Sequence, residues 1–136
     1  MLKRLLIVVS LLVFISGCSV KQETLNTKPE KLEHLTQDLV ALGKGVDPKE
    51  AKAFAKESLF YSRELAGKYK LMAPANFHNL LINMGYRERG LCYEWSEDMM
   101  EHLKKQKFKS FDLRWGVAFK GEPMEHNSVV VVAKGG

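Results

Sequence analysis

The chain has 136 residues, a length that suits a single domain, since single domains usually contain about 100–150 residues. Its apolar fraction of 46% excludes an intrinsically disordered chain. With only two cysteines it can form neither a disulfide framework nor a four-cysteine zinc site, so the fold must be held together by a hydrophobic core. The formal net charge of +5 would favour an anionic partner, but part of it lies in a segment that we expect to be removed.

The first residues have the pattern of an export signal. Residues 1–4 are a short basic start, and ten of the eleven residues 5–15 are apolar. An apolar run of this length is typical of a signal peptide, whereas a membrane-spanning helix needs about 20 residues. The run ends in Ile15-Ser16-Gly17-Cys18, an aliphatic residue and two small residues followed by a cysteine.

This ending resembles the lipobox of bacterial lipoproteins. The resemblance implies that residues 1–17 are cleaved off and that Cys18 carries lipid, whose several acyl chains anchor the protein stably in a membrane. Ser19 stands where an aspartate would retain a lipoprotein in the inner membrane, so the resemblance favours the outer membrane, facing the periplasm. Cleavage removes two cations, and the remaining charge no longer indicates an anionic partner. The alternative is an ordinary signal peptide with a chance cysteine.

The rest of the chain is predicted to be a polar tether over residues 18–28 and one domain over residues 29–136. A first helix is expected from Pro29 to Leu42, with leucines every three or four residues and Gly43 at its end.

The second helix has a strong start signal. Asp47 is a good N-cap, Pro48 follows at the first helical position, and Glu50 stands where the second half of a capping box belongs. This helix is predicted to continue to Gly67.

Two shorter helices follow. Pro74 opens one that ends at Gly85, and its apolar residues have helical spacing: Phe77, Leu80, Leu81 and Met84. The other is predicted over residues 91–106, with acidic residues early and lysines late, as the helix dipole favours. Its expected buried face consists of Cys92, Trp95, Met99 and Leu103.

The apolar period then changes to that of strands. Residues 111–119 alternate between apolar and other residues, which predicts a half-buried strand. A turn over 121–124 leads to residues 128–133, whose four consecutive valines predict a strand buried on both faces. Helices followed by an antiparallel hairpin predict an α+β domain. Because a two-stranded sheet with a fully buried strand is incomplete, we expect a partner or, preferably, a further C-terminal portion of the natural chain to cover it.

Cys92 is the candidate reactive group. It lies in the first turn of the fourth predicted helix, just after Arg89, and helix starts and nearby cations in general favour the thiolate form of a cysteine. About 15 helical residues carry the chain roughly 22 Å away. About ten strand residues return it by roughly 33 Å. If the helix packs antiparallel on the strand, His126 comes back near Cys92 and is the candidate base.

The stretch Gly90-Leu91-Cys92-Tyr93-Glu94-Trp95 at a helix start, with His126-Asn127-Ser128 entering a later strand, resembles the papain-like superfamily. The closest branches are the transglutaminase-like and NlpC-type cysteine peptidases. The resemblance covers residues 74–133 and implies a partial papain-like fold that needs no cofactor or metal.

By this resemblance Cys92 is the nucleophile and His126 the base, and the Cys92 backbone N–H belongs to an oxyanion hole. Asn83 or Tyr86 would supply a further donor there, and Trp95 would line the pocket. The strand that carries a third, orienting residue in the family is missing, and Asn127 is a poor substitute because it alternates with His126 across the strand.

Two functions are therefore expected. The first is an envelope-anchored cysteine hydrolase or acyl-transferase that acts on amide or peptide bonds, in peptidoglycan or in a periplasmic peptide or protein. The second is a non-catalytic lipoprotein that uses the same scaffold for binding or envelope assembly. In that case Cys92 is a small core residue and His126 a strand-edge residue.

The remaining polar residues indicate no other chemistry. His34, His78 and His102 lack histidine partners at helical spacing, so no zinc site is expected. The lysines between 104 and 109 are predicted to be a solvated helix end, and an exported protein is not expected to bind nucleic acid.

Overall fold

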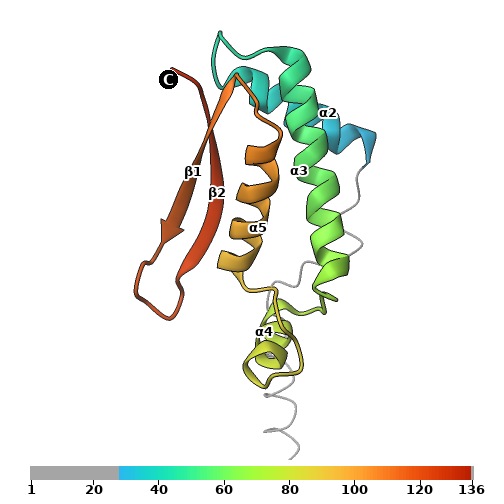
Figure 1. Cartoon of the computed structure of the whole chain (residues 1–136), viewed down its shortest axis with the longest axis vertical. Helices are drawn as coiled ribbons and strands as arrows, with labels where there is room; N and C mark the ends of the chain where they lie inside the picture. The colour runs from blue at the N-terminus through green and yellow to red at the C-terminus, as the bar shows by residue number, and fades with distance from the viewer. Residues whose placement is uncertain (1–27, 136) are drawn as a thin grey trace, which may run out of the picture.

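The computed structural model describes residues 28–135 (Figure 1). The signal, Cys18 and all of the predicted tether except its last residue lie outside them. The described chain forms four helices followed by two strands: α2 (Pro29–Ala41), α3 (Pro48–Lys68), α4 (Ala75–Asn83), α5 (Cys92–Lys105), β1 (Phe111–Ala118) and β2 (His126–Ala133). The predicted α+β arrangement is confirmed.

The elements form layers (Figure 1). The hairpin lies on one side, α5 runs along it, and α3 and α2 lie beyond α5. The strands pair antiparallel in a register that sets Phe111 opposite Ala133 and Ala118 opposite His126. Since α5 packs mainly on β2 and also on α3, it connects the sheet to the other helices.

The main core lies at the end of the molecule where α3 begins, α5 ends and the hairpin opens. Its buried side chains come from all these elements: Leu39, Val46, Ala51, Phe54, Ala55, Leu103 and Phe111. The Phe54 ring lies 5.1 Å from the ring of Phe108 and 5.0 Å from that of Phe111, measured between centroids. Such tilted pairs are the geometry that aromatic rings prefer.

The buried face of α5 differs from the predicted one. Of the four residues expected there, Leu103 is buried, whereas Cys92, Trp95 and Met99 are half-buried. Buried instead are Glu94, Ser96 and Met100. The helix faces two neighbours, α3 and the hairpin, and a cavity between them keeps the first half of the apolar stripe partly open.

The prediction that β2 is buried on both faces is wrong. Val129 and Val131 pack against the core, but Ser128 and Val130 are exposed, Val130 by 40%. Within the described residues only one face of the hairpin is covered, chiefly by α5. A run of valines has no period with which to show that one face is open.

The start of α3 is joined to the hairpin by a set of hydrogen bonds. Asp47 Oδ1 accepts the backbone N–H groups of Lys49 at 2.6 Å and Glu50 at 3.2 Å, so the predicted N-cap is confirmed. Glu50, however, does not close a capping box. Its carboxylate accepts the N–H groups of Lys109, at 2.9 and 3.1 Å, and of Ser110, at 2.7 Å.

Ser110 completes this connection. Its Oγ accepts the Asp47 N–H at 3.0 Å, and its carbonyl accepts the Lys134 N–H at 2.9 Å. We call Asp47, Glu50, Ser110 and Lys134 the α3–hairpin clamp. Hydrogen bonds from the Ser110 side chain and the Lys109 backbone lower the pKa of the Glu50 carboxyl below its ordinary value of 4.5.

We predict that Glu50→Gln lowers the free energy of unfolding by about 1–2 kcal/mol at neutral pH, because charge-assisted hydrogen bonds become neutral ones. Since the folded-state pKa of Glu50 is lowered, its contribution is present above pH 4.5 and is lost as the pH falls through the folded-state value. Urea denaturation at several pH values should show the two proteins converging in acid. Glu64→Gln, at an exposed position of the same helix, should change stability by less than about 0.5 kcal/mol. Equal stability of the Glu50→Gln and unmodified proteins at neutral pH would contradict the role of the clamp.

Candidate functional site

A cavity of about 520 Å³ lies between α3, α5 and the inner face of the hairpin. We call it the α5–hairpin cavity. Its apolar walls are Phe54, Leu71, Trp95, Met99, Leu103, Val129 and Val131. Its polar lining residues are Ser58, Ser62, Asn79, Cys92, Ser96, His126 and Asn127. A concave, mostly apolar site with a few polar groups is the usual form of a ligand-binding pocket.

Cys92 is the first residue of α5 and its thiol is half-buried. The N–H groups before it, those of Gly90 and Leu91, donate to Glu94 Oε2 at 2.7 and 2.9 Å. The Cys92 N–H is the first of the helix and therefore has no acceptor within it.

The electrostatics at the helix start are more balanced than the sequence indicates. The buried Glu94 carboxylate lies in the first turn, where its charge offsets part of the helix dipole. Arg89 does not serve the thiol, because its Nη2 donates to Asp98 Oδ1 and to Glu97 Oε2, both at 3.2 Å. The thiolate-favouring cation expected from the sequence is therefore occupied by carboxylates.

His126 is the first residue of β2, and its exposed side chain belongs to the lining of the cavity. The predicted approach of Cys92 and His126 to one site is thus what the fold produces. Strand alternation, however, puts His126 in register with the outer-face residues Ser128 and Val130. Within residues 28–135, neither the Cys92 thiol nor the His126 ring has a hydrogen-bond partner, so the two groups share the cavity without forming a closed dyad.

Asn127, rather than His126, shares the covered face with Val129 and Val131. Its side chain is fixed: Trp115 Nε1–H donates to Asn127 Oδ1 at 2.8 Å, and Asn127 Nδ2–H donates to Glu125 Oε1 at 3.2 Å. With both ends of its amide engaged, Asn127 does not orient His126. Trp115 and Asn127 stand diagonally across the strands, a pairing that the alternating pattern could have indicated.

The other predicted site residues divide between the cavity and the surface. Trp95 lines the cavity, as expected, and packs edge-on against Tyr69 with 5.2 Å between ring centroids. Asn83 and Tyr86 are exposed and do not line the cavity, so the structure brings neither to Cys92. Tyr86 lines a separate hollow, because the chain turns at Gly85, which adopts a left-handed φ of 79°.

His78 is a residue whose importance the sequence did not reveal. It is buried, and its Nδ1 accepts the Met72 N–H at 3.3 Å, so Nε2 carries the proton and donates to the Arg89 carbonyl at 3.1 Å. Its ring lies so close to Gly90 that a Cβ there would stand 2.3 Å from Nε2. His78 thereby joins the loop before α4 to the segment that leads into Cys92.

A second group of polar side chains supports the same segment. The Tyr69 hydroxyl donates to Asp98 Oδ2 at 2.5 Å, and Lys68 lies 3.6 Å from the same oxygen. Burial raises the pKa of Tyr69, and its bond to Asp98 adds to this. Burial opposes ionisation of Asp98 as well, but the Tyr69 hydroxyl and the charge of Arg89 outweigh it and lower the pKa of that carboxyl.

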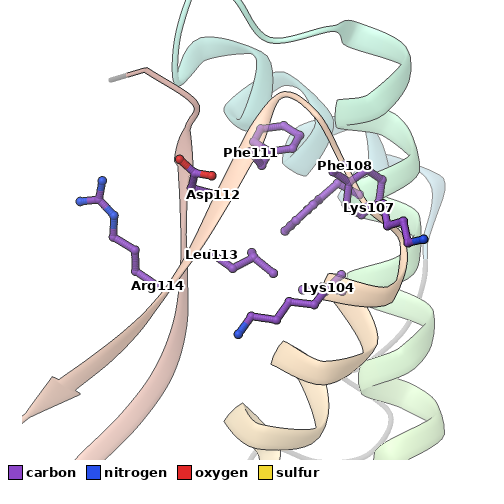
Figure 2. A pocket seen from close by; sticks show the side chains of 9 residues that line it. Lys104, Lys107, Phe108, Phe111, Asp112, Leu113 and Arg114 are labelled. Atoms are coloured by element: carbon purple, nitrogen blue, oxygen red, sulfur yellow. The ribbon is translucent and has the colours of Figure 1, made fainter.

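Another hollow, of about 450 Å³, lies where α5 passes to β1. Cationic side chains surround its aromatic floor, but Figure 2 shows Lys107 and Arg114 pointing away from it in opposite directions. The lysines at 104, 105, 107 and 109 are exposed, as predicted for a solvated helix end. They do not converge on a site for an anion.

No protein-family model, no curated protein and no solved structure matches this chain. The likeness to the papain-like superfamily therefore stays a prediction. Across residues 28–135, no three or more His, Cys, Asp or Glu side chains are grouped so as to hold a metal ion. Over the same residues, no helix has the length and apolar character needed to cross a bilayer.

We predict that Gly90→Ala destabilises the protein by about 2–3 kcal/mol, because the added methyl meets the buried His78 ring and Gly90 has a φ of 135°. Gly67→Ala is the matched control: that glycine lies in α3 with no atom within 4 Å of the added methyl. It should raise stability by about 0.5–1 kcal/mol. Urea denaturation measures both, and a Gly90→Ala protein as stable as the unmodified one would contradict the described packing of His78.

Proposed function

We propose that the protein is a lipid-anchored envelope lipoprotein that uses the Cys92 thiol to cleave or transfer acyl groups of amides or peptides. One observation carries the proposal. Cys92 and His126, which lie far apart in the sequence, line the same apolar cavity at the start of a helix. A thiol, a nitrogen base and an unused backbone N–H at one cavity mouth are the parts that such chemistry needs.

The reaction assigns one step to each group. His126 accepts the Cys92 thiol proton, and the sulfur attacks the amide carbonyl carbon. The Cys92 N–H donates to the oxyanion that forms. When the C–N bond breaks, His126 returns the proton to the leaving amine and a thioester remains on Cys92. Water then hydrolyses the thioester, or an acceptor amine takes up the acyl group.

The cavity favours a substrate with an apolar group next to the scissile bond. Its aliphatic and aromatic walls would surround that group, and Trp95 and Met99 lie on the same helix as Cys92. Ser58 Oγ is buried in α3 and has no hydrogen-bond partner within the described chain, so a polar atom of a bound substrate could satisfy it. An amide of peptidoglycan or of a periplasmic peptide or protein fits the expected location.

We predict that Cys92 reacts with iodoacetamide at neutral pH about tenfold faster than a free cysteine, because His126 takes up the thiol proton. His126→Ala should remove this advantage. His34→Ala, an exposed histidine on α2, is the control and should leave the rate unchanged. The alkylation rate is read by mass spectrometry of the Cys92 peptide. A rate that does not respond to His126→Ala would rule out the dyad.

The anchor is tested separately. With a lipid analogue of palmitate supplied to expressing cells, we predict that the unmodified protein is labelled and enters the membrane fraction. Cys18→Ser should abolish the label and leave residues 1–17 attached, since the modified cysteine is part of the cleavage signal. Cys92→Ser should keep both label and cleavage. Labelling that follows Cys92 instead would contradict the assignment of Cys18.

The second candidate function is binding without catalysis. It is favoured by the engaged Asn127 amide, which leaves His126 without an orienting partner, and by the hairpin, which has two unpaired strand edges in the described chain. Envelope crosslinking with Cys92→Ala separates the two functions. A partner captured equally well by that variant favours binding, whereas a thioester adduct seen only with Cys92 favours the enzyme.

A further inference from the structure

Helix α4 and its C-cap present three large apolar side chains on the outside. Phe77, Leu80 and Met84 are 42%, 50% and 58% exposed, and their spacing places them on one helical face. The rest of the helix carries the buried His78 and the half-buried Asn79, Leu81 and Ile82. Large apolar side chains that are exposed together on one helical face are typical of an interaction surface, so the stripe calls for an occupant.

The position of α4 explains why no other element covers the stripe. Figure 1 shows α4 at the end of the molecule opposite the main core, beyond the start of α5. It has no extensive packing with another described helix or strand. His78 fixes it through Met72 and Arg89, which lie before and after the helix. The stripe is therefore presented on a fixed support.

Two cations, Lys70 and Arg87, line a hollow together with Tyr86, and Tyr86 and Arg87 follow α4 in the chain. Lys70 is exposed, Arg87 is half-buried, and neither has a carboxylate partner among residues 28–135. Arg87 extends across the exposed Met72, with Nη2 3.4 Å from its sulfur. Tyr86 is 66% exposed beside them, and Glu88 is the nearby acid. An apolar helical stripe with cations and an aromatic side chain near it is typical of helices that lie in a bilayer interface.

We infer that α4 is a docking surface for an anionic lipid bilayer. Phe77, Leu80 and Met84 insert at the boundary between headgroups and acyl chains, while Lys70 and Arg87 contact lipid phosphates. We call these five residues the α4 docking surface. The inference goes beyond the covalent anchor at Cys18, and it requires no thiol chemistry.

A second copy of the chain suits this surface less well. The three apolar side chains and Tyr86 expose roughly 400 Å², given that large side chains bury about 150–250 Å² each. A stable interface needs about 800 Å² from each partner. A bilayer needs no such area, and its phosphates match the cations.

The test measures how deeply α4 enters the bilayer. The full chain is reconstituted into vesicles of phosphatidylcholine with a quarter phosphatidylglycerol, whose acyl chains carry bromine. The fluorescence of the introduced tryptophan is obtained by subtracting the emission of Trp95 and Trp115. This fluorescence should be quenched about twofold more in Leu80→Trp than in Phe60→Trp. Phe60 is the matched control, since it is 49% exposed on α3, away from α4.

A charge arm tests the contribution of the lipid phosphates. Lys70→Glu in the Leu80→Trp protein should lower the quenching about twofold, whereas Lys52→Glu, on exposed α3 surface, should not. High salt or vesicles of pure phosphatidylcholine should have the same effect as Lys70→Glu.

Three results would overturn the inference. The first is that Leu80→Trp is quenched no more than Phe60→Trp. The second is that the quenching does not change with anionic lipid or with Lys70→Glu. The third is that, without vesicles, the new tryptophan becomes more shielded from solvent as the protein concentration rises. The last would identify a second copy as the occupant. Because the readout involves neither Cys92 reactivity nor lipid on Cys18, failure here leaves the proposed function standing.

Discussion

The Glu50 carboxylate holds the described domain together at the point where its two halves meet. It accepts backbone N–H groups from Lys109 and Ser110, at the entrance to β1, while Asp47 caps the start of its own helix. The Lys134 N–H joins the far end of β2 to the same serine. Packing of Phe54 on Phe111 and of α5 on the hairpin follows from this alignment, and so does the cavity that contains Cys92.

Features encoded by neighbouring residues could be predicted from the sequence. The helix starts at Pro29 and Pro48, the N-cap at Asp47 and the existence of β1 all depend on local chemistry, and the structure has them. The predicted alternation of β1 holds only over its first half, since Trp115 and Val117 are exposed. The shared location of Cys92 and His126 followed from the lengths of one helix and one strand. The predictions that were wrong concern features that depend on distant partners. Glu50 binds across the fold instead of closing a capping box, and the valines of β2 are covered on one face only.

The candidate site shows the same division. Sequence spacing predicted that Cys92 and His126 would line one site. It did not predict that Asn127 would lie on the covered face of β2, because the strand register decides which residue faces α5. Arg89 lies three residues before the helix, yet Asp98 and Glu97 bind it. His78 looked like an isolated helical histidine. His78 holds the segment before Cys92 in place through its contacts with Met72 and Gly90, and helical periodicity does not connect these residues to it.

The clamp has a mechanical consequence for the hairpin. The strands are fastened where β1 begins and β2 ends, and the inner face is packed on the core there but open around Trp115 and Val117. The hairpin is thus held in place at the end where β1 begins and β2 ends. His126 lies at the other end of the hairpin, so its distance from Cys92 depends on how far that end stands from α5. A bound molecule of the right thickness could act as the spacer that sets that distance.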